Sequence, residues 1–417
     1  MLELKFIREN ADLVKKNLER RGWANVSDVD SVIETDAKIR SEKGELDNLR
    51  SEKNSINARI NETKKKGGDI KELLEKAKSL PLEIKQKEEK YAALEQHLKT
   101  ILVSIPNLLD ESVPIGKDDT GNVVIREVGR KHAYKFKPKS HVDLLEPMKL
   151  ADLERAAKIS GARFYFLKNE LVLLEQALIK FALDFFYKKG YGLISPPYLM
   201  KQEPYEGVTD LEAFQDVLYK IEDEDLYLIA TSEHAMAAMH MNETLALPIK
   251  YAGISPCFRK EAGSHGKDTK GIFRVHQFNK VEQFIFCKQE DSWKYFDELL
   301  SNSEEIMQML KIPYRVINIC TGDIGSIASK KIDLEAWMPA QEAYREVVSC
   351  SNCLSYQATR LNIKDDEKRF AHTLNSTALA TTRIMVAIME NFQNEDGSVN
   401  VPEALHPYLH RIKRIPP

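Results

Sequence analysis

Residues 274–287, RVHQFNKVEQFIFC, combine the composition of a strand with side chains that could hold a nucleotide. Valine, phenylalanine and isoleucine favour a strand, in which side chains alternate between two faces. One face then carries Arg274, His276, Phe278, Lys280 and Glu282, and the other carries Val275, Val281 and Ile285 as expected core. Arginine can bind phosphate, phenylalanine can stack on a base and glutamate can bind a cation. The pattern predicts the floor of a binding site.

The segment CFRKEAG, residues 257–263, ends an apolar run on charged residues. By the same alternation, Arg259 and Glu261 should share one face of the preceding strand, and the loop 262–273 should join the two strands as a long hairpin. In isolation, such an arginine and glutamate more often form a structural ion pair. Their neighbours at 274–282 favour a role in binding instead.

Two later segments could complete the site. In EVVSCSNC, residues 346–353, Glu346 and Ser349 offer the hard oxygen atoms that Mg²⁺ prefers, but their strand parity differs, so a bulge or strand end has to bring them together. Residues 374–392, LNSTALATTRIMVAIMENF, open with small polar residues and are expected to become an apolar helix. Arg383 inside it would be costly to bury without an anion. No GxxxxGK[ST] sequence is present, so arginines and a metal would have to hold any phosphate groups.

Cys350 and Cys353 have the CxxC spacing of zinc ligands. No second pair lies nearby in the sequence, and only His372 is a plausible partner. We therefore expect a turn beside the site and no zinc.

The N-terminal quarter of the chain has a different pattern. Apolar residues recur with three-four spacing over residues 32–60 and again over 73–101, where Lys87 alone breaks the second run. This heptad pattern is typical of coiled-coil helices, and KKKGGD at 64–69 lets the chain reverse between them. We expect an antiparallel two-helix coiled-coil arm, with Pro81 either kinking the second helix or marking a boundary.

Two interpretations of the arm are open. A two-helix hairpin buries little surface, so it could be a dimerisation element or a spacer. It could also grip an extended polyanion through the basic residues near its tip, Lys64, Lys65 and Lys66.

The length and the composition of the chain indicate how many domains to expect and in which cellular compartment. A chain of 417 residues is long for one domain, and its texture changes after residue 106, so we expect a helical domain at 1–106 and an α+β domain at 107–417. The net charge of −3 gives no global attraction to nucleic acid. Five cysteines favour a reducing compartment, and the absence of a signal-peptide pattern or a membrane-spanning run predicts a cytoplasmic protein with no membrane partner.

In this order along the chain, several segments resemble the motifs of class II aminoacyl-tRNA synthetases: Pro196–Pro197 after a long helix, FRKE at 258–261 and ALATTR at 378–383. More narrowly, TSE at 231–233, RVHQFNKVEQF at 274–284, EVVSCSNCLSYQATR at 346–360 and the helical hairpin resemble the seryl-tRNA synthetase family. The resemblance extends over essentially the whole chain. It implies an antiparallel-sheet catalytic domain, preceded by an arm that binds tRNA.

The resemblance also implies a role for each matching residue. Arg259, Arg383 and Glu346 would be catalytic. The residues around L-serine would be Thr231, Ser232, Glu233, Glu282, Asn375 and Thr377. The residues around ATP would be Arg259, Lys260, Glu261, Arg274, Val275, Phe278, Glu346, Val347, Val348, Ser349 and Arg383, with Mg²⁺ on Glu346 and Ser349. The residues of the arm that contact tRNA would be Lys64, Lys65 and Lys66.

The implied reaction is the activation of L-serine with ATP to seryl-adenylate and pyrophosphate, followed by transfer of serine to the 3′ end of tRNA(Ser) by a homodimer. Whether tRNA(Sec) is charged as well stays open. A non-catalytic relative that binds nucleic acid is a second class, but it would be expected to lack Arg259, Glu282 or Arg383. An amino acid:carrier-protein ligase is a third class, which shares the catalytic core and lacks the helical arm.

Overall fold

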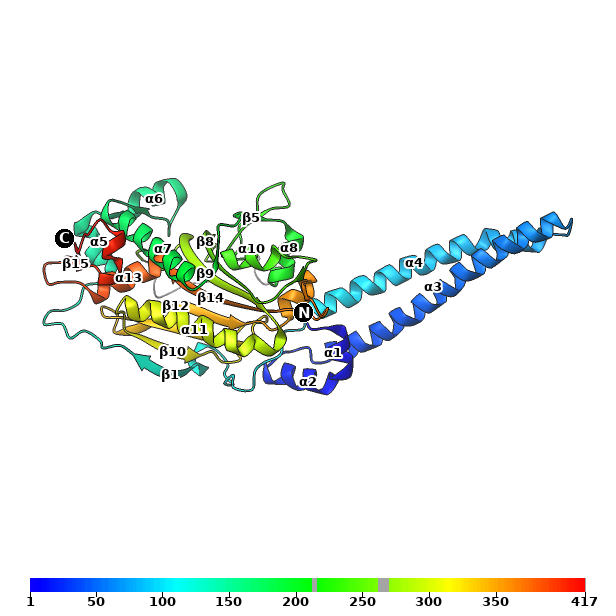
Figure 1. Ribbon diagram of the computed structural model, residues 1–417, viewed down its shortest axis with the longest axis horizontal. Helices are drawn as coiled ribbons and strands as arrows, with labels where there is room; N and C mark the ends of the chain where they lie inside the picture. Colours follow the sequence, from blue (N-terminus) through cyan, green and yellow to red (C-terminus); the bar gives the residue numbers. More distant parts are fainter. Residues whose placement is uncertain (212–215, 262–269, 417) are drawn as a thin grey trace. The chain divides into compact units, whose positions relative to one another are not determined.

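The computed structural model describes residues 1–211, 216–261 and 270–416, and it divides into two compact units, Met1–Pro106 and Asn107–Pro417. Helices α1 (Leu4–Glu9), α2 (Ala11–Arg20), α3 (Asp28–Lys65) and α4 (Lys71–Ser104) make up the first unit (Figure 1). None of the helices in the described residues is long and apolar enough to cross a membrane.

Helices α3 and α4 form the expected antiparallel coiled-coil pair (Figure 1). The apolar side chains buried on the two predicted seams include Val32, Ile39, Leu46, Ile56, Leu80, Ile84 and Leu98. The chain reverses at Gly67, whose φ of 70° is in the left-handed region that glycine adopts without strain. Helix α4 continues through Pro81, so the proline does not mark a boundary.

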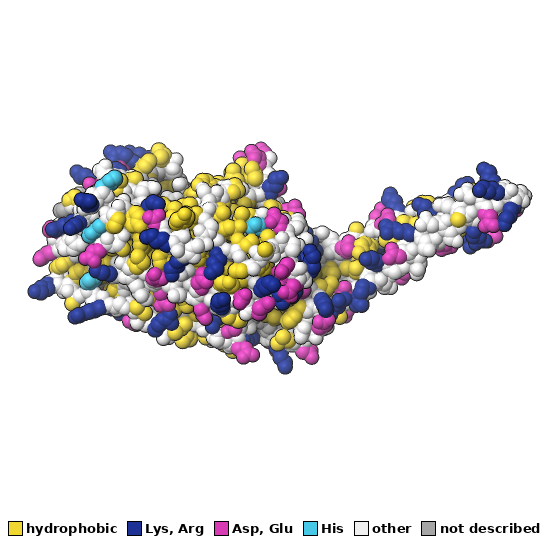
Figure 2. Space-filling model, viewed as in Figure 1, with side chains coloured by type: hydrophobic (Ala, Val, Ile, Leu, Met, Phe, Trp, Pro, Cys, Tyr) yellow, Lys and Arg dark blue, Asp and Glu magenta, His cyan; other side chains and the backbone are white. Residues whose placement is uncertain are grey.

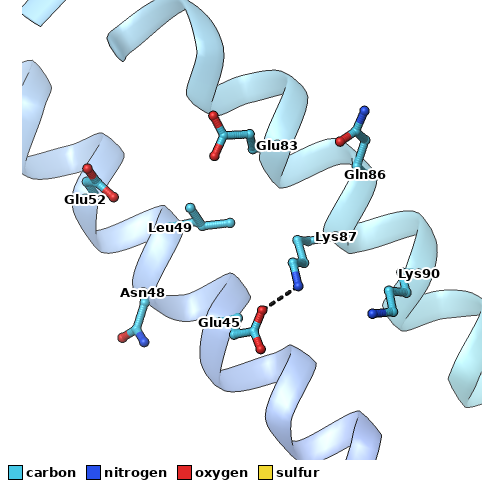
Figure 3. A pocket seen from close by; sticks show the side chains of 8 residues that line it. All are labelled: Glu45, Asn48, Leu49, Glu52, Glu83, Gln86, Lys87 and Lys90. Atoms are coloured by element: carbon cyan, nitrogen blue, oxygen red, sulfur yellow. Dashed lines mark hydrogen bonds and ion pairs between the residues drawn. The ribbon is translucent and has the colours of Figure 1, made fainter.

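A cluster of charges fills the break in the heptad pattern at Lys87. Its Nζ lies 2.9 Å from Glu42 Oε2 and also contacts Glu45, and Lys90 contacts the other carboxylate oxygen of Glu42. Figure 3 shows Lys87 reaching from α4 towards Glu45 on α3. A groove of approximately 560 Å³ beside the cluster is lined by Glu45, Asn48, Leu49, Glu52, Glu83, Gln86, Lys87 and Lys90. The seam accepts a lysine here because its ammonium group is paired.

The second unit is built on an eight-stranded sheet with the strand order β1-β10-β11-β12-β14-β9-β8-β4. Neighbouring strands are antiparallel, except that β4 and β8 are parallel. The strands are β1 (Val123–Val128), β10 (Tyr314–Asn318), β11 (Lys330–Met338), β12 (Ala343–Asn352), β14 (His372–Ala380), β9 (Gln277–Cys287), β8 (Ile249–Phe258) and β4 (Gly192–Ile194). The α+β class with an antiparallel sheet is therefore confirmed.

Helices and short strands surround this sheet. The helices are α5 (His141–Met148), α6 (Leu153–Ser160), α7 (Glu170–Lys188), α8 (Gln202–Val208), α10 (Ser232–Ala238), α11 (Ser292–Met309), α12 (Tyr356–Leu361) and α13 (Thr381–Asn391), with 3₁₀ turns η1 (Asp119–Gly121), η2 (Gln289–Asp291) and η3 (Glu403–Tyr408). Four two-stranded pairs complete the fold: β2 (Ala151–Asp152) with β3 (Phe166–Leu167), β5 (Leu199–Met200) with β6 (Tyr227–Leu228), β7 (Thr244–Leu245) with β13 (Lys364–Asp365), and β15 (Val399–Asn400) with β16 (Arg414–Ile415).

The main core lies where α7, α11 and α13 pack against the sheet. Helix α7 turns Leu174, Leu178 and Phe181 into this core, so its apolar face is interior packing. Val281 and Ile285 of β9 belong to the same core, as strand parity predicts. The alternate residues of β9 are thereby left for the opposite face of the sheet.

Residues 374–392 are not one helix. Strand β14 continues to Ala380, and α13 begins at Thr381. The small polar opening belongs to β14, which pairs with β9 and, at residues 374–376, with β12, and the apolar part of the segment is helical as expected.

Candidate active site

A cavity of approximately 380 Å³ lies on the face of the sheet opposite the main core. The strands β9, β12 and β14 contribute to it, together with α10, the start of α13 and the loop 324–328. Predicted site residues that line it are Thr231, Glu233, Arg259, Phe278, Glu282, Glu346, Val347, Ser349, Asn375, Thr377 and Arg383. Residues that are up to 152 positions apart in the chain, such as Thr231 and Arg383, thus share one cavity.

Other predicted site residues lie outside the described lining of this cavity. Ser232 is fully buried, and its Oγ donates to Gly253 O at 3.1 Å. Val348 belongs to the main core, and Val275 packs beside Phe278 and Cys257. Lys260 donates its backbone N–H to Val217 O at 2.8 Å. Glu261 and Arg274 also lie outside this lining, and their side chains pair with each other.

Strand parity places the functional side chains of β9. Phe278, Lys280 and Glu282 line the cavity, as the alternating pattern predicts. Arg274 and His276 were expected on the same face, but β9 begins at Gln277 and both residues precede it. His276 instead stacks on Phe164 and its Nδ1 hydrogen-bonds with Arg259 O at 2.8 Å.

The parity expected for Arg259 and Glu261 fails because β8 ends at Phe258. Glu261 has a φ of 49°, so the chain turns between the two residues. The Arg259 guanidinium lies 5.4 Å from the Phe278 ring centroid, and its Nε donates to Ala230 O at 3.3 Å. Glu261 instead accepts from Arg274 Nε at 2.5 Å. Of the predicted hairpin loop 262–273, residues 262–269 lie outside the described residues.

One end of the cavity is rich in carboxylates. Thr231 caps helix α10, accepting from the backbone N–H of Glu233, and this directs Glu233 into the cavity. Burial, followed by the charge of Glu282, raises the pKa of Glu233 to about 7. Burial also raises the pKa of Glu282, although Lys280 Nζ lies 2.5 Å from it. A bound cation would stabilise the ionised forms of these two carboxyl groups.

The other end of the cavity carries Glu346, Ser349 and Arg383. Asp333 pairs with Ser349 and Glu335 with Glu346, so Val347 is the extra residue of a bulge between β11 and β12. The bulge brings Glu346 and Ser349 to the same cavity, as their unequal parity required.

Arg383 fixes the carboxylate of Glu346. Its Nη1 donates at 2.9 Å both to Glu346 O and to Glu346 Oε1. Desolvation in the cavity opposes ionisation of Glu346, but the positive charges of Arg383, Lys331 and Arg259 outweigh it and lower the pKa. Glu346 is therefore an ionised oxygen donor at neutral pH.

Two residues of the cavity lining and one residue behind it are absent from the sequence-based assignment. Lys280 could have been found, because it shares parity with Phe278 and Glu282. Lys331 lies 3.6 Å from the buried Asp333, whose pKa burial raises to about 7. Gln357 donates to Glu233 Oε1 at 3.3 Å, and no periodicity in the sequence marks it.

Metal-ligand clusters of three or more His, Cys, Asp or Glu side chains do not occur in residues 1–211, 216–261 or 270–416. All five cysteines are unpaired and buried. Cys353 lines the cavity, where Asn375 Nδ2 lies 3.6 Å from its Sγ, and burial raises the pKa of its thiol.

The tip of the arm presents the predicted basic residues. Lys64 and Lys65 end α3, Lys66 follows them, and all three are exposed. Lys66 Nζ lies 2.5 Å from Glu62 Oε1. Figure 2 shows dark blue side chains gathered towards this end of the arm, with acidic side chains interspersed.

A mainly antiparallel sheet, with Arg259 directly after β8 and Arg383 in the first turn of α13 after β14, is the arrangement expected of a class II aminoacyl-tRNA synthetase core. Residues 219–392 match the tRNA synthetase class II core domain (G, H, P, S and T), and residues 1–109 match the seryl-tRNA synthetase N-terminal domain.

Full-length relatives narrow the class to one family. A serine–tRNA ligase of Methanoculleus marisnigri is 52% identical over 420 residues, covering 98% of this chain and 99% of that protein. A serine–tRNA ligase of Methanocella arvoryzae is 49% identical over 423 residues, covering 99% of this chain and 100% of that protein. The crystal structure of seryl-tRNA synthetase from Pyrococcus horikoshii complexed with ATP is 48% identical, has a TM-score of 0.93 and covers 100% of both chains. The chain belongs to the seryl-tRNA synthetase family.

Proposed function

We propose that this chain activates L-serine with ATP and then transfers the seryl group to the 3′ end of tRNA(Ser). The observation that carries this proposal is the convergence of Arg259, Phe278, Glu282 and Arg383 on one cavity. A carboxylate-rich end suited to an ammonium group and an arginine-rich end suited to phosphate lie within that single space.

Adenylation needs orientation and charge stabilisation more than proton transfer. The serine carboxylate is already ionised, and one of its oxygens attacks the α-phosphorus of ATP in line. A new P–O bond forms, the bond from the α-phosphorus to the bridging oxygen breaks, and pyrophosphate leaves with the electron pair. Arg259 holds the α-phosphate and Arg383, with Arg274, holds the triphosphate tail, where arginines stabilise the developing charge. Phe278 stacks on adenine.

Arg274 does not line the cavity in this structure. It pairs with Glu261 beside a segment that the structure does not describe. Its assignment to the triphosphate therefore requires exchange of a carboxylate for a phosphate, which is a stronger bidentate acceptor for arginine.

Glu346 and Ser349 have the donor atoms that would hold Mg²⁺. Both are hard oxygen ligands, both reach the cavity through the bulge, and Glu346 is ionised. Behind Ser349, Asp333 Oδ1 is buried and has no hydrogen-bond partner among the described residues. Two protein ligands suit Mg²⁺, which completes its coordination with water and substrate phosphates and neutralises their charge when bound.

Recognition of L-serine uses the carboxylate-rich end. Thr231, Glu233 and Glu282 surround the ammonium and hydroxyl groups, with Asn375 and Thr377 beside them. A site that hydrogen-bonds a hydroxyl rejects alanine, because its own polar groups would be left unpaired. Threonine has to be rejected by lack of space.

In the second step, a ribose hydroxyl at the 3′ end of tRNA attacks the carbonyl carbon of seryl-adenylate. The new ester bond replaces the mixed anhydride bond, and AMP leaves. The exposed lysines at the tip of the arm, Lys64, Lys65 and Lys66, contact the phosphate backbone of tRNA, so recognition weakens with salt. Transfer of serine to tRNA(Sec) would be a second reaction of the same kind, and a charging assay with that tRNA would detect it.

We also propose that the enzyme works as a homodimer in the cytoplasm. Five unpaired cysteines suit a reducing compartment. Light scattering during gel filtration at micromolar concentration tests the dimer, and a monomeric mass would contradict it.

Serine-dependent exchange of pyrophosphate into ATP tests the proposed activation step. A panel of amino acids is assayed with and without tRNA, followed by charging of tRNA(Ser). We expect exchange with serine in the absence of tRNA and an ester product in its presence. Exchange with glycine or alanine in preference to serine would overturn the substrate assignment.

A further inference from the structure

Gln357, on α12, holds Glu233 from behind the cavity wall. Gln357 has no exposed surface, and its Nε2 donates to Glu233 Oε1 at 3.3 Å. The same nitrogen donates to Val208 O at 3.2 Å, and Gln357 Oε1 accepts from Thr373 Oγ1 at 2.7 Å. Every polar atom of this side-chain amide therefore has a partner.

These partners fix which way the amide faces. Val208 O is a backbone carbonyl and can only accept a hydrogen bond, so the NH₂ group of Gln357 must lie on that side. Glu233 lies on the same side and receives the second N–H. The amide cannot flip without placing its oxygen against two acceptors.

A second amide contacts the same carboxylate oxygen. Asn375 Nδ2 donates to Glu233 Oε1 at 3.1 Å, from β14. Both bonds fall on Oε1, and across the described residues no protein donor binds Oε2. Since Glu233 lines the cavity, its second oxygen is left for a ligand.

We propose that Gln357 is a positioning residue for amino-acid recognition: together with Asn375 it clamps Oε1 of Glu233 and presents Oε2 to the ammonium or hydroxyl group of the substrate. The proposal rests on the proposed function, in which Glu233 contacts L-serine. The segment EVVSCSNCLSYQATR contains Gln357 but assigns it no role, and the cavity lining does not include it, because Gln357 acts through Glu233.

The clamp also affects the ionisation of Glu233. The ionisable groups that surround this carboxyl are Glu282, Lys280, Arg259, Tyr205 and Cys353, and His234 is its neighbour in the chain. Burial lowers the pKa of His234 to about 3 and raises that of Cys353, so both are neutral near pH 7. Burial and Glu282 raise the pKa of Glu233, while Lys280, the Gln357 donor and Arg259 lower it. Removal of the donor should therefore raise this pKa further.

The test is Gln357→Met in the full-length protein, assayed by pyrophosphate exchange between pH 6 and 9. We expect the KM for serine at pH 8 to rise about tenfold or more, as for loss of a hydrogen bond to a charged group. The KM for ATP should change less than about twofold, because the clamp touches no group assigned to ATP. The acidic limb of serine binding should shift to higher pH.

Thr373→Val is the matched control. It removes the partner of Gln357 Oε1 and keeps both amide donors, so the serine KM should change less than about threefold. If Gln357→Met folds poorly, Gln357→Leu also removes the donor to Glu233, and the same rise in the serine KM is expected.

The outcomes separate the clamp from the function. The clamp is refuted by an unchanged serine KM, an unshifted pH profile, parallel changes in the KM for ATP, or an equal effect of Thr373→Val. Failure of the unaltered protein to exchange with serine would refute the proposed function itself. A serine-specific rise in KM with a shifted pH profile supports both.

Discussion

Each unit of the molecule holds carboxylates against lysines, and the two arrangements differ in how well the charges are balanced. In the arm, Glu42 is 7% exposed between α3 and α4, and both of its oxygens meet an ammonium group, from Lys87 and Lys90. Hydrogen bonds from Lys90 and then Lys87 lower the pKa of Glu42. This cluster is complete without any ligand.

The carboxylate-rich end of the catalytic cavity is not complete. Glu233 and Glu282 share one neighbouring ammonium, that of Lys280, and burial raises the pKa of both carboxyl groups. Groups whose ionisation is opposed by their surroundings mark functional sites, because a ligand of opposite charge can restore the balance. From this contrast we infer that the charges around Glu42 stabilise the arm, whereas those around Glu233 and Glu282 bind a ligand.

The largest effect should come from Arg259→Ala. Loss of the group that stabilises charge at the α-phosphate should lower pyrophosphate exchange by about 10²- to 10³-fold. Arg155→Ala is the control, because its side chain is 75% exposed on α6 and pairs with Asp152. Exchange that falls less than about tenfold in Arg259→Ala would contradict the assignment.

Glu233→Gln should sharpen the contrast through pH. Because an ammonium ligand requires the carboxylate, serine affinity should fall as the pH drops through the pKa of about 7, by up to about tenfold per unit. Calorimetric titration with serine should show this dependence in the unaltered protein. In Glu233→Gln, affinity should be low and nearly independent of pH over the same range.

The same substitution should stabilise the ligand-free protein at alkaline pH. A folded-state pKa raised above the ordinary range means that the native state binds the proton more tightly, so stability is lost as the pH rises towards and through 7. Glu233→Gln removes this loss and should add roughly 1–3 kcal/mol at pH 8, and close to nothing below pH ~4, where both states are protonated. An equal gain in Tm at both pH values would contradict the raised pKa.

Neutralising the arm tip should have a smaller effect, confined to the second step. Lys64→Gln, Lys65→Gln and Lys66→Gln together should weaken charging of tRNA(Ser) by about tenfold, with a shallower dependence on salt. Serine-dependent pyrophosphate exchange should be unchanged, because that step needs no tRNA. Equal loss in both assays would show that the substitutions damage the protein in general.

Periodic patterns were sufficient where one regular element decided the geometry. The heptad spacing located the buried seam of α3 and α4, and strand parity located Phe278, Lys280 and Glu282 on one face of β9. The unequal parity of Glu346 and Ser349 required a bulge or a strand end, and the structure has a bulge at Val347. These features follow from the backbone repeat alone.

Predictions failed where a regular element ended or where the partner was distant in sequence. The alternation of strand side chains predicts Glu261 and Arg274 on the cavity face, but both residues lie beyond the ends of β8 and β9. In the structure these two side chains pair with each other. Gln357 lies within the quoted segment 346–360, but no pattern there singles it out, because its contacts with Val208 and Glu233 are remote in the sequence.

Pro81→Ala should have the smallest effect on activity while changing the arm itself. Proline has no N–H, so Ala77 O in α4 lacks its usual helical donor, and an alanine would restore it. We expect the local stability of α4 around this position to rise by about 1–3 kcal/mol, seen as slower amide hydrogen exchange. Leu82→Ala is the control, because this exposed neighbour changes the side chain without restoring a donor.

Pyrophosphate exchange and tRNA charging by Pro81→Ala also test the comparison between the arm and the catalytic cavity. Serine-dependent exchange should be unaffected, since the balanced charges and packing of the arm contribute to its own fold. Charging of tRNA(Ser) should stay within about twofold, because the exposed lysines at the tip are unchanged. A large loss of charging together with slower hydrogen exchange would mean that the arm must bend at Pro81 to bind tRNA, and that this unit is not the passive element its balanced charges suggest.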